Sequence, residues 1–330
     1  MAWATKLFEL RSLQHGIEIF ARLYAYSLAL CFRVLLSFGW LLMSLATLRR
    51  VFPALNEQVL RMVAKTYVDG VAELRARRPE RIVLIRHGQS QFQADRGILE
   101  RTPDNALSLT ELGFAQAREA GRKLRQELGP NARVLFFTSP YLRTQQTLKE
   151  VILGGEFAPG DFQIREDIRL RELDFGQLQD PTSMDFHIEQ RLKVGRFWYR
   201  PSGGEACCDL FDRMSLFLDS LFREIDSVRH VVPRPDSFTY DNVVIICHGL
   251  SMRLFCHRYF RWTLDEFLQV YNPENCETWV LRKMPDCNSR YKLVTRGILV
   301  GPSRDTPLPE RMKYPRSVSG ELDFTYLGDI

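Results

Sequence analysis

Cysteine is scarce in this chain of 330 residues, and its pattern excludes two common kinds of site. The seven cysteines are an odd number at irregular spacings, which does not fit the disulfide framework of a small secreted domain. They also lack the paired C-x-x-C spacing with which proteins hold a structural zinc ion. We therefore expect the folded part of the chain to work in a reducing compartment.

Excess charge of either sign is missing from most of the chain. The net charge of +5 belongs to residues 1–80, which hold 11 basic and 6 acidic residues, whereas residues 81–330 hold 34 of each. No run of lysine and arginine is interleaved with aromatic residues, so we expect no nucleic-acid partner. Positive charge beside an apolar stretch favours a membrane surface instead.

Long apolar runs are absent apart from residues 23–48, whose only charged residue is Arg33. A membrane-spanning helix needs roughly 20 apolar residues, but an arginine inside it costs about 3 kcal/mol. Arg49 and Arg50 follow as a positive flank. Residues 49–64 hold three arginines and residues 8–22 hold two, and this difference favours the cytosolic side of a membrane for the following domain. Two interpretations stay open: membrane association through this stretch, or a helix packed on the domain of a soluble cytoplasmic protein.

Amino-acid composition and hydrophobic patterning divide the chain into three parts. Residues 1–80 are an apolar and basic helical region, in which apolar residues at helical spacing predict a connecting helix over 53–79. Residues 81–300 alternate short apolar strands with helices, which is typical of an α/β domain with a mostly parallel sheet. Residues 301–330 carry several prolines and are expected to form an extended tail. The expected architecture is three layers, αβα.

Three short apolar runs predict strands that are buried on both faces. Each run ends in residues that bind anions or carry out acid–base chemistry. Ligands in such sheets bind beyond the carboxyl ends of the strands, so these residues are expected to meet. The runs are 82–85, 134–137 and 243–247, followed by Arg86-His87-Gly88, Thr138-Ser139-Pro140 and His248-Gly249.

The residues at these strand ends suit the binding of an anion. Arg86, together with Arg143 one helical turn after the second strand, offers planar forks that match phosphate oxygens. His87 is a nucleophile near pH 7 when its imidazole is neutral. A leaving oxygen also needs an acid, for which Glu172 is the candidate. Glu166, Asp167 and Asp174 compete for that role, and the spacing of Glu172 to Gly176 favours Glu172.

Helix signals flank these strands. Ser108 and Glu111 have capping-box spacing, which predicts that a helix begins at Ser108 and ends at Gly129-Pro130. An apolar stripe over 210–225 and the run 250–260 predict two more helices. Gly203-Gly204-Glu205 is expected to turn into the first of these two.

Taken in order, these motifs resemble the histidine phosphatase superfamily, which includes the cofactor-dependent phosphoglycerate mutases. The resemblance runs from about Arg81 to Leu254 and is greatest to phosphoglycerate mutase-like proteins of plants and fungi. The blocks that carry it are Arg86-His87-Gly88, Leu109-Thr110 with Gln116-Ala117, Ser139-Pro140 with Arg143-Thr144 and Thr147, Glu172 with Phe175-Gly176, Gly203-Gly204-Glu205, and His248-Gly249.

The resemblance implies a role for each candidate residue. His87 would be phosphorylated, and Glu172 would protonate the leaving oxygen and then activate water. Arg86, Arg143 and His248 would bind the phosphoryl group, and no metal or other cofactor is implied. Gln93 stands where the family usually has asparagine, and we carry it over as a further phosphate ligand.

Two departures separate the chain from the mutases. Phe175 stands where they usually have tyrosine, and Ser183 stands where they usually have lysine. Both departures favour hydrolysis of a phosphorylated small molecule or a phosphoprotein. A mutase, and a membrane-tethered scaffold that binds phosphorylated ligands, are the alternatives. The loops 91–107 and 177–201 are expected to set specificity, and their arginines either bind extra substrate charge or form a solvated face.

Overall fold

The computed structural model describes residues 57–176, 181–226, 238–284, 290–295 and 310–313. The prediction for residues 23–48 therefore lies outside the described residues. Among those described, no helix combines the length and apolar character needed to cross a membrane. The chain divides into two units between Leu74 and Arg75; helix α3 (Glu57–Ala76) belongs mainly to the first unit, and the elements below belong to the second.

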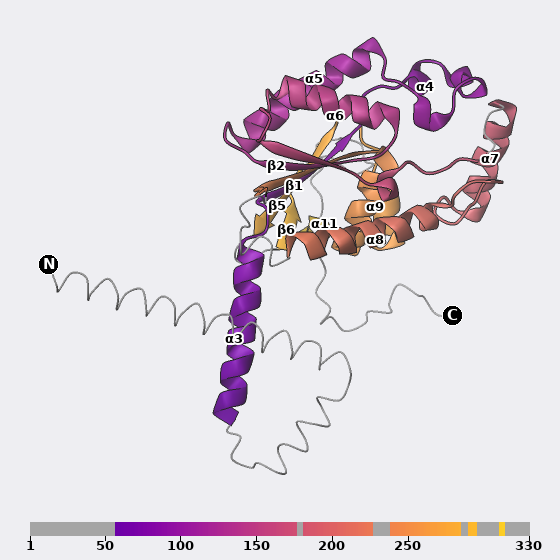
Figure 1. Ribbon diagram of the computed structural model, residues 1–330. Coiled ribbons are helices and arrows are strands. Elements are labelled where there is room, and N and C mark those ends of the chain that lie inside the picture. Colours follow the sequence, from indigo (N-terminus) through magenta and orange to yellow (C-terminus); the bar gives the residue numbers. More distant parts are fainter. Residues whose placement is uncertain (1–56, 177–180, 227–237, 285–289, 296–309, 314–330) are drawn as a thin grey trace, which may run out of the picture. The chain divides into compact units, whose positions relative to one another are not determined.

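The second unit is built on a six-stranded sheet in the order β3-β2-β4-β1-β5-β6 (Figure 1). The strands β3, β2, β4 and β1 run parallel, and β5 and β6 are antiparallel additions at one edge. The prediction of an α/β fold with a mostly parallel sheet is confirmed. The strands are β1 (Arg81–Arg86), β2 (Val134–Thr138), β3 (Phe162–Glu166), β4 (Asn242–Cys247), β5 (Thr278–Met284) and β6 (Arg290–Leu293).

Helices cover both faces of the sheet, as the fully buried central strands require. Ile82 and Leu84 of β1 pack into the core under α8 (Cys207–Ile225) and α9 (Gly249–Phe260). Val83 and Ile85 pack on the other face, against residues of α5 (Glu111–Leu128) and α6 (Leu142–Gly154). Figure 1 shows the two pairs of helices on opposite sides of the sheet, which makes three layers.

The start of α5 differs from the capping prediction. The helix is capped by Thr110, whose Oγ1 accepts a hydrogen bond from the Gly113 N–H at 3.1 Å. Ser108 comes too early because Leu109 is still extended, in a bridge with Ser90. The Ser108 hydroxyl donates instead to Gln146 Oε1 at 3.0 Å. The predicted end is confirmed, since Gly129 closes the helix with φ of 93°.

The first turn of α5 lies directly against the loop that follows β1. A Cβ added to Gly113 would lie 2.1 Å from the carbonyl oxygen of Gln89, and one added to Gly88 would lie 2.5 Å from the carbonyl oxygen of Gly113. Both contacts are with backbone, which does not move aside as a side chain does. Only glycine fits at either position, so backbone packs on backbone beside His87.

Shorter elements complete the second unit. They are α4 (Gln91–Ala94), η1 (Arg96–Glu100), η2 (Asp104–Ala106), η3 (Ile168–Leu170), α7 (Pro181–Val194), α10 (Leu264–Gln269) and α11 (Glu310–Lys313). Helix α11 lies within the segment expected to be extended. The side chain of Met312 in α11 is buried, and its carbonyl oxygen accepts a hydrogen bond from Trp262 Nε1 at 2.8 Å. This part of the tail therefore packs on the domain.

Candidate active site

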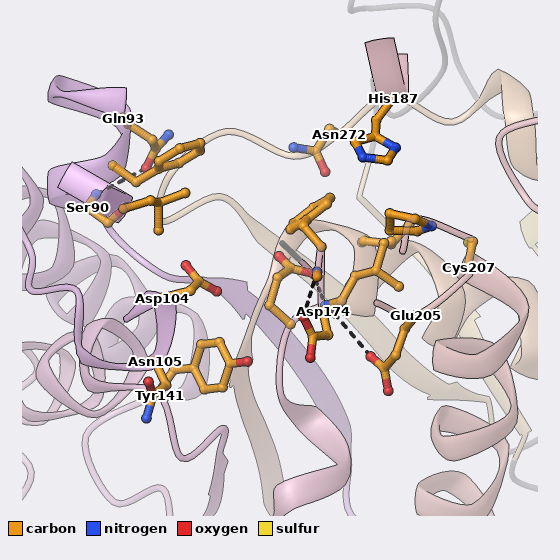
Figure 2. Close-up of a pocket in the computed structure, with 18 of the residues that line it drawn as sticks. Ser90, Gln93, Asp104, Asn105, Tyr141, Asp174, His187, Glu205, Cys207 and Asn272 are labelled. Atoms are coloured by element: carbon orange, nitrogen blue, oxygen red, sulfur yellow. Dashed lines mark hydrogen bonds between the residues drawn. The ribbon is translucent and has the colours of Figure 1, made fainter. Parts of the chain in front are cut away.

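A cavity of about 830 Å³ is lined by residues that follow β1 and β2, as expected for a sheet of this kind. Five of the six predicted site residues line it, and the sixth, His248, is fully buried against them. The five are Arg86, His87, Gln93, Arg143 and Glu172. Figure 2 shows Ser90, Gln93, Asp104 and Tyr141 on one side of the cavity, and His187 and Cys207 on the other.

His87 lies directly after β1 and is only 5% exposed. Its Nδ1 is 2.7 Å from the carbonyl oxygen of Gly88, and a carbonyl oxygen only accepts, so the hydrogen must be on Nδ1. Burial, followed by the charges of Arg143 and Arg86, holds the His87 pKa well below its ordinary value. The ring is therefore neutral at pH 7, with the lone pair of Nε2 available to attack.

The backbone around His87 is fixed by α6. The Gly88 N–H donates to Thr147 Oγ1 at 3.0 Å, and the Thr147 hydroxyl donates to the carbonyl oxygen of Arg143 at 2.7 Å. The His87 N–H donates to the carbonyl oxygen of Cys247 on β4. Thr147 was part of a recognised motif in the sequence, but its positioning role was not predicted.

His248 contacts both His87 and Glu172. The His87 and His248 rings meet edge to face with centroids 5.3 Å apart, and His248 Nδ1 is 3.7 Å from Glu172 Oε2. His248 Nε2 is 2.9 Å from the hydroxyl of Ser139, whereas Nδ1 is buried without a hydrogen-bond partner. Burial, followed by the charge of Arg143, holds the His248 pKa well below its ordinary value. His248 thus holds a buried nitrogen, Nδ1, beside Glu172 that makes no hydrogen bond within the protein.

Glu172 has the environment of a proton donor. Its side chain is 15% exposed, and Oε1 accepts a hydrogen bond from the Leu173 N–H at 2.9 Å. Burial raises its pKa, against the opposing effects of that hydrogen bond and of Arg143. Of its competitors, Glu166 accepts from Gln145 and Asp167 pairs with Arg169, and neither lines the cavity. Asp174 does line it, and accepts from the Gly176 N–H.

The loop that carries Glu172 is held by Arg213, a buried charge on the apolar stripe of α8. One guanidinium donates to three carbonyl oxygens within four residues of that loop, which fixes the path of its backbone. Its hydrogen bonds go to the carbonyl oxygens of Arg169 at 2.7 Å, Arg171 at 2.9 Å and Glu172 at 3.0 Å.

Glu205 completes this support. Its Oε2 accepts from Arg213 at 2.7 Å and from the Asp174 N–H at 3.2 Å, and its Oε1 accepts from Arg171. Burial alone would raise the pKa of Glu205, but its contacts with the arginines outweigh burial and lower that pKa, so the carboxylate stays ionised. Sequence reasoning treated Gly203-Gly204-Glu205 as a turn and did not find this role. A charged residue within the apolar stripe of α8 was the signal for it.

The two predicted phosphate-binding arginines have different protein partners. Arg143 is 4% exposed and forms a two-pronged ion pair with Asp104, in which Nη1 and Nη2 lie 3.0 Å and 3.2 Å from the carboxylate oxygens. Arg86 donates through Nη1 to the carbonyl oxygen of Pro273 at 2.5 Å, and its buried Nε has no partner. Burial lowers the Arg86 pKa. Asp104 and Pro273 were not found from the sequence.

Gln93 lines the cavity but is held by its neighbours. Its Oε1 accepts from the Ser90 N–H at 3.1 Å and from Asn275 Nδ2 at 3.0 Å, and its Nε2 donates to Asn275 Oδ1 at 2.9 Å. Asn275 Nδ2 also lies 3.1 Å from the carbonyl oxygen of His87. One hydrogen of the Gln93 amide remains for a ligand. No local sequence pattern predicted Asn275.

Within the described ranges, no three histidine, cysteine, aspartate or glutamate side chains gather as ligands for a metal ion. The positive charge of the site comes from arginine. The cysteines in those ranges are free thiols: Cys207, Cys208, Cys247, Cys256 and Cys276.

Comparison with known proteins assigns the chain to a family. A model of the histidine phosphatase superfamily (branch 1) matches residues 82–289, which include every residue of the site. The chain belongs to the histidine phosphatase superfamily. The resemblance predicted from its motifs is thereby confirmed.

Two similar proteins illustrate the range of the superfamily. The chain is 43% identical over 212 residues to phosphoglycerate mutase-like protein AT74H of Arabidopsis thaliana, covering 62% of this chain and 74% of that one. It is 26% identical over 305 residues to the broad-range acid phosphatase DET1 of Saccharomyces cerevisiae, covering 66% and 89%. A mycobacterial glucosyl-3-phosphoglycerate phosphatase shares the fold, with a TM-score of 0.50, 21% identity and coverage of 66% and 98%.

Proposed function

We propose that this member of the superfamily is a metal-independent phosphatase, which hydrolyses phosphomonoesters through a phosphohistidine at His87. One observation carries the proposal: a neutral His87, with Nε2 free, shares an arginine-lined cavity with a carboxyl group whose pKa is raised. That combination supplies a nucleophile, an anion-binding pocket and a general acid. The similarity to an acid phosphatase supports the same reading.

In the first step, His87 Nε2 attacks phosphorus and the bond to the ester oxygen breaks. Glu172 gives its proton to that oxygen, so the leaving group departs as an alcohol. Arg86 Nε and His248 Nδ1, both buried without protein partners, donate to the phosphoryl oxygens together with Arg143. These fixed donors stabilise the charge that develops in the transition state.

In the second step, the Glu172 carboxylate takes a proton from a water molecule whose oxygen attacks the phosphorus of phosphohistidine. The N–P bond breaks, inorganic phosphate leaves, and His87 returns to its neutral form with the hydrogen on Nδ1. Both steps thus use one carboxyl group, first as acid and then as base. Gln93 offers one further amide hydrogen to the phosphoryl group.

Phe175 favours hydrolysis over a mutase reaction. Its ring lines the cavity and is 42% exposed, so an apolar surface stands where mutases usually place a tyrosine hydroxyl. Such a surface offers no hydrogen bond to hold a sugar acid while it turns between two phosphoryl transfers. Ser183, the second departure, lies in α7, and its side chain is outside the described residues.

The test is phosphate release from para-nitrophenyl phosphate without added metal, comparing the full chain with His87→Ala. We expect turnover to fall about 10⁴-fold or more, because no other side chain replaces the nucleophile. Arg122→Gln, an exposed change on α5 away from the cavity, is the matched control. Activity that survives His87→Ala would contradict the proposal, and faster interconversion of phosphoglycerates than phosphate release would make the protein a mutase.

We further propose that residues 23–48 attach the protein to a membrane, with the catalytic domain on the cytosolic side. The support is the length of this apolar stretch and its basic flank. Flotation of the full chain with vesicles of anionic lipid tests the attachment, beside a variant that carries Leu36→Asp and Leu42→Asp. Recovery of both proteins in the unbound fraction would leave the buried-helix interpretation in place.

A further inference from the structure

Beyond Arg86 and Arg143, four more arginines line the same cavity. One of them, Arg96, is exposed in η1, and the other three come from separate segments that follow Glu172 in the chain. Arg191 is on α7, Arg196 is in the turn that follows it, and Arg253 is on α9. Arg191 lies one helical turn after His187, which Figure 2 places across the cavity from Asp104 and Tyr141. These segments meet only in the folded chain, so the grouping is a product of tertiary structure.

The three arginines have no carboxylate partner within the described parts of the chain, unlike Arg143 with Asp104. Arg253 lies over the ring of Phe267, 4.6 Å from its centroid, and donates through Nη2 to the Phe267 carbonyl oxygen at 3.2 Å. Its Nε is buried and has no hydrogen-bond partner. A buried donor without an acceptor is costly, and an anion in the cavity would supply the acceptor.

The charges are close enough to repel one another. Burial, followed by the charges of Arg191 and Arg196, lowers the pKa of Arg253 to about 10. Burial lowers the pKa of Arg191 as well, with Arg196 adding to the effect. Like charges in a partly desolvated site destabilise the protein unless a counter-charge is bound. Carboxylates also line the cavity, but none within the described residues forms an ion pair with these three arginines.

Cys207 links this group to the catalytic acid. The thiol is 2% exposed and lines the cavity, and burial raises its pKa to about 12. The charges of Arg253 and Arg191 oppose that rise, and the charge of Glu172 adds to it. A neutral thiol therefore lies within reach of both groups. One cavity thus holds His87, the catalytic acid and the three arginines.

We propose that Arg191, Arg196 and Arg253 form a second anion subsite that binds a phosphate or carboxylate group at the far end of the substrate. The inference rests on the proposed phosphatase function and narrows it. The substrate class is a phosphomonoester with a second anionic group, separated from the reacting phosphoryl group by a short spacer. Arg191 and Arg253 are half-buried and form the floor of the subsite, and Arg196 is exposed at its rim.

Binding to His87→Ala protein tests the subsite without turnover. The ligands are α,ω-alkanediol bisphosphates of two to six carbons, each compared by calorimetry with the monophosphate of the same diol. The monophosphate keeps a hydroxyl where the second phosphate was, so the ratio of the two dissociation constants isolates the second anion. At the best spacer length we expect a ratio of about 10 to 100. ω-Phosphooxyalkanoates of the same lengths distinguish a carboxylate from a phosphate.

Substitution assigns the effect to named residues. Arg191→Gln and Arg253→Gln are each expected to lower that ratio about tenfold, and Arg253→Lys to recover part of it by keeping the charge. Arg122→Gln, outside the cavity, is the control. A ratio near one at every spacer length overturns the proposal, and so does a high ratio that none of these substitutions lowers.

Inhibition measurements provide a second readout should His87→Ala fold poorly. The bisphosphates and monophosphates then compete with para-nitrophenyl phosphate in the unaltered protein, and the same ratio is taken from their inhibition constants. The two proposals fail separately. A protein that releases no phosphate but keeps the binding ratio contradicts the phosphatase function alone, whereas turnover with a ratio near one contradicts the subsite alone.

Discussion

The cavity is lined by two groups of arginines that differ in how they are held. Arg86 and Arg143, beside the catalytic residues, are called the inner end below, and the proposed anion subsite is called the outer end. At the inner end, Arg143 is fixed by the carboxylate of Asp104 and Arg86 by the carbonyl oxygen of Pro273. At the outer end, Arg253 rests on Phe267, and Arg191 and Arg196 have no ion pair among the described residues. Arginines held in one position can stabilise a transition state of one shape. Arginines held by fewer contacts can adjust to anionic groups at several distances from the reacting phosphorus. The two proposals thus assign reaction and specificity to different groups of arginines in one cavity.

Removal of the acid at the inner end should have the largest effect. Glu172→Gln keeps the shape of the side chain but supplies no proton, so we expect turnover of an alkyl phosphate to fall about 10²- to 10⁴-fold. An aryl phosphate, whose leaving oxygen needs less protonation, should lose much less. Steady-state kinetics on the two esters check this. Equal losses on both would mean that Glu172 does not protonate the leaving group.

Arg143→Gln tests the fixed donors of the same end. We expect a loss of about 10²- to 10³-fold in kcat, because the substitution removes a charge that stabilises the transition state. The ratio of bisphosphate to monophosphate affinity should stay within a factor of about three. Thermal unfolding of the variant separates this from loss of the fold. If Arg143→Gln lowered the ratio of bisphosphate to monophosphate affinity and left kcat unchanged, Arg143 would belong to the second anion subsite and the distinction between the two groups of arginines would be wrong.

The pH profile should also report the inner end. His87 must be neutral to attack phosphorus. Its pKa lies well below the ordinary value, so the neutral imidazole persists to more acidic pH than a free histidine would. Glu172 must be protonated in the first step, and its raised pKa extends that form to higher pH than for a free carboxyl. As pH rises through that value, the rate of phosphohistidine formation should fall about tenfold per unit. Rapid-quench measurement of phosphoenzyme formation checks this, and a rate that rises with pH would contradict it.

Arg213→Met should have a smaller effect, because Arg213 positions the acid and does not touch the substrate. Loss of its bonds to three carbonyl oxygens loosens the Glu172 loop, and we expect kcat to fall about tenfold with little change in KM. Dependence on the leaving group should become steeper, as for Glu172→Gln. Arg213→Lys should recover part of the rate. A change in KM alone would indicate a merely structural role.

Arg196→Gln should have the smallest effect. The side chain is exposed at the rim, so solvent screens its charge and we expect the bisphosphate to monophosphate ratio to fall only about two- to fivefold. Raising the salt concentration should reduce the contribution of Arg196 more than that of Arg253. Calorimetry at two ionic strengths checks the order. A larger effect at Arg196 than at Arg253 would reverse the assignment of rim and floor.

The sequence predicted the inner end better than the outer one, for a physical reason. Arg86 ends β1, and His87 and His248 directly follow β1 and β4, so the local pattern and the rule for strand ends were enough to predict that they meet. Asn275 and Pro273, which hold Gln93 and Arg86, come from a loop more than 180 positions away. No local pattern carries such contacts.

The remaining differences also trace to tertiary structure. Ser108 had the spacing of a cap, but the bridge between Ser90 and Leu109 keeps the chain extended until Thr110. The arginines of the specificity loops were open to two interpretations from sequence, and only their place around the cavity distinguishes Arg191 and Arg196 from Arg101, which does not line it. Residues 1–56 lie outside the described residues, so the predictions for them stay predictions.

The contact of Gly88 with Gly113 has a mechanical consequence. Because backbone meets backbone there, no compressible side chain lies between α5 and the residue after His87. If the first turn of α5 moved, the backbone beside His87 would have to move with it. Where side chains separate two elements, they can change rotamer and leave the second element in place. The first turn of α5 therefore limits how far the backbone beside His87 can move.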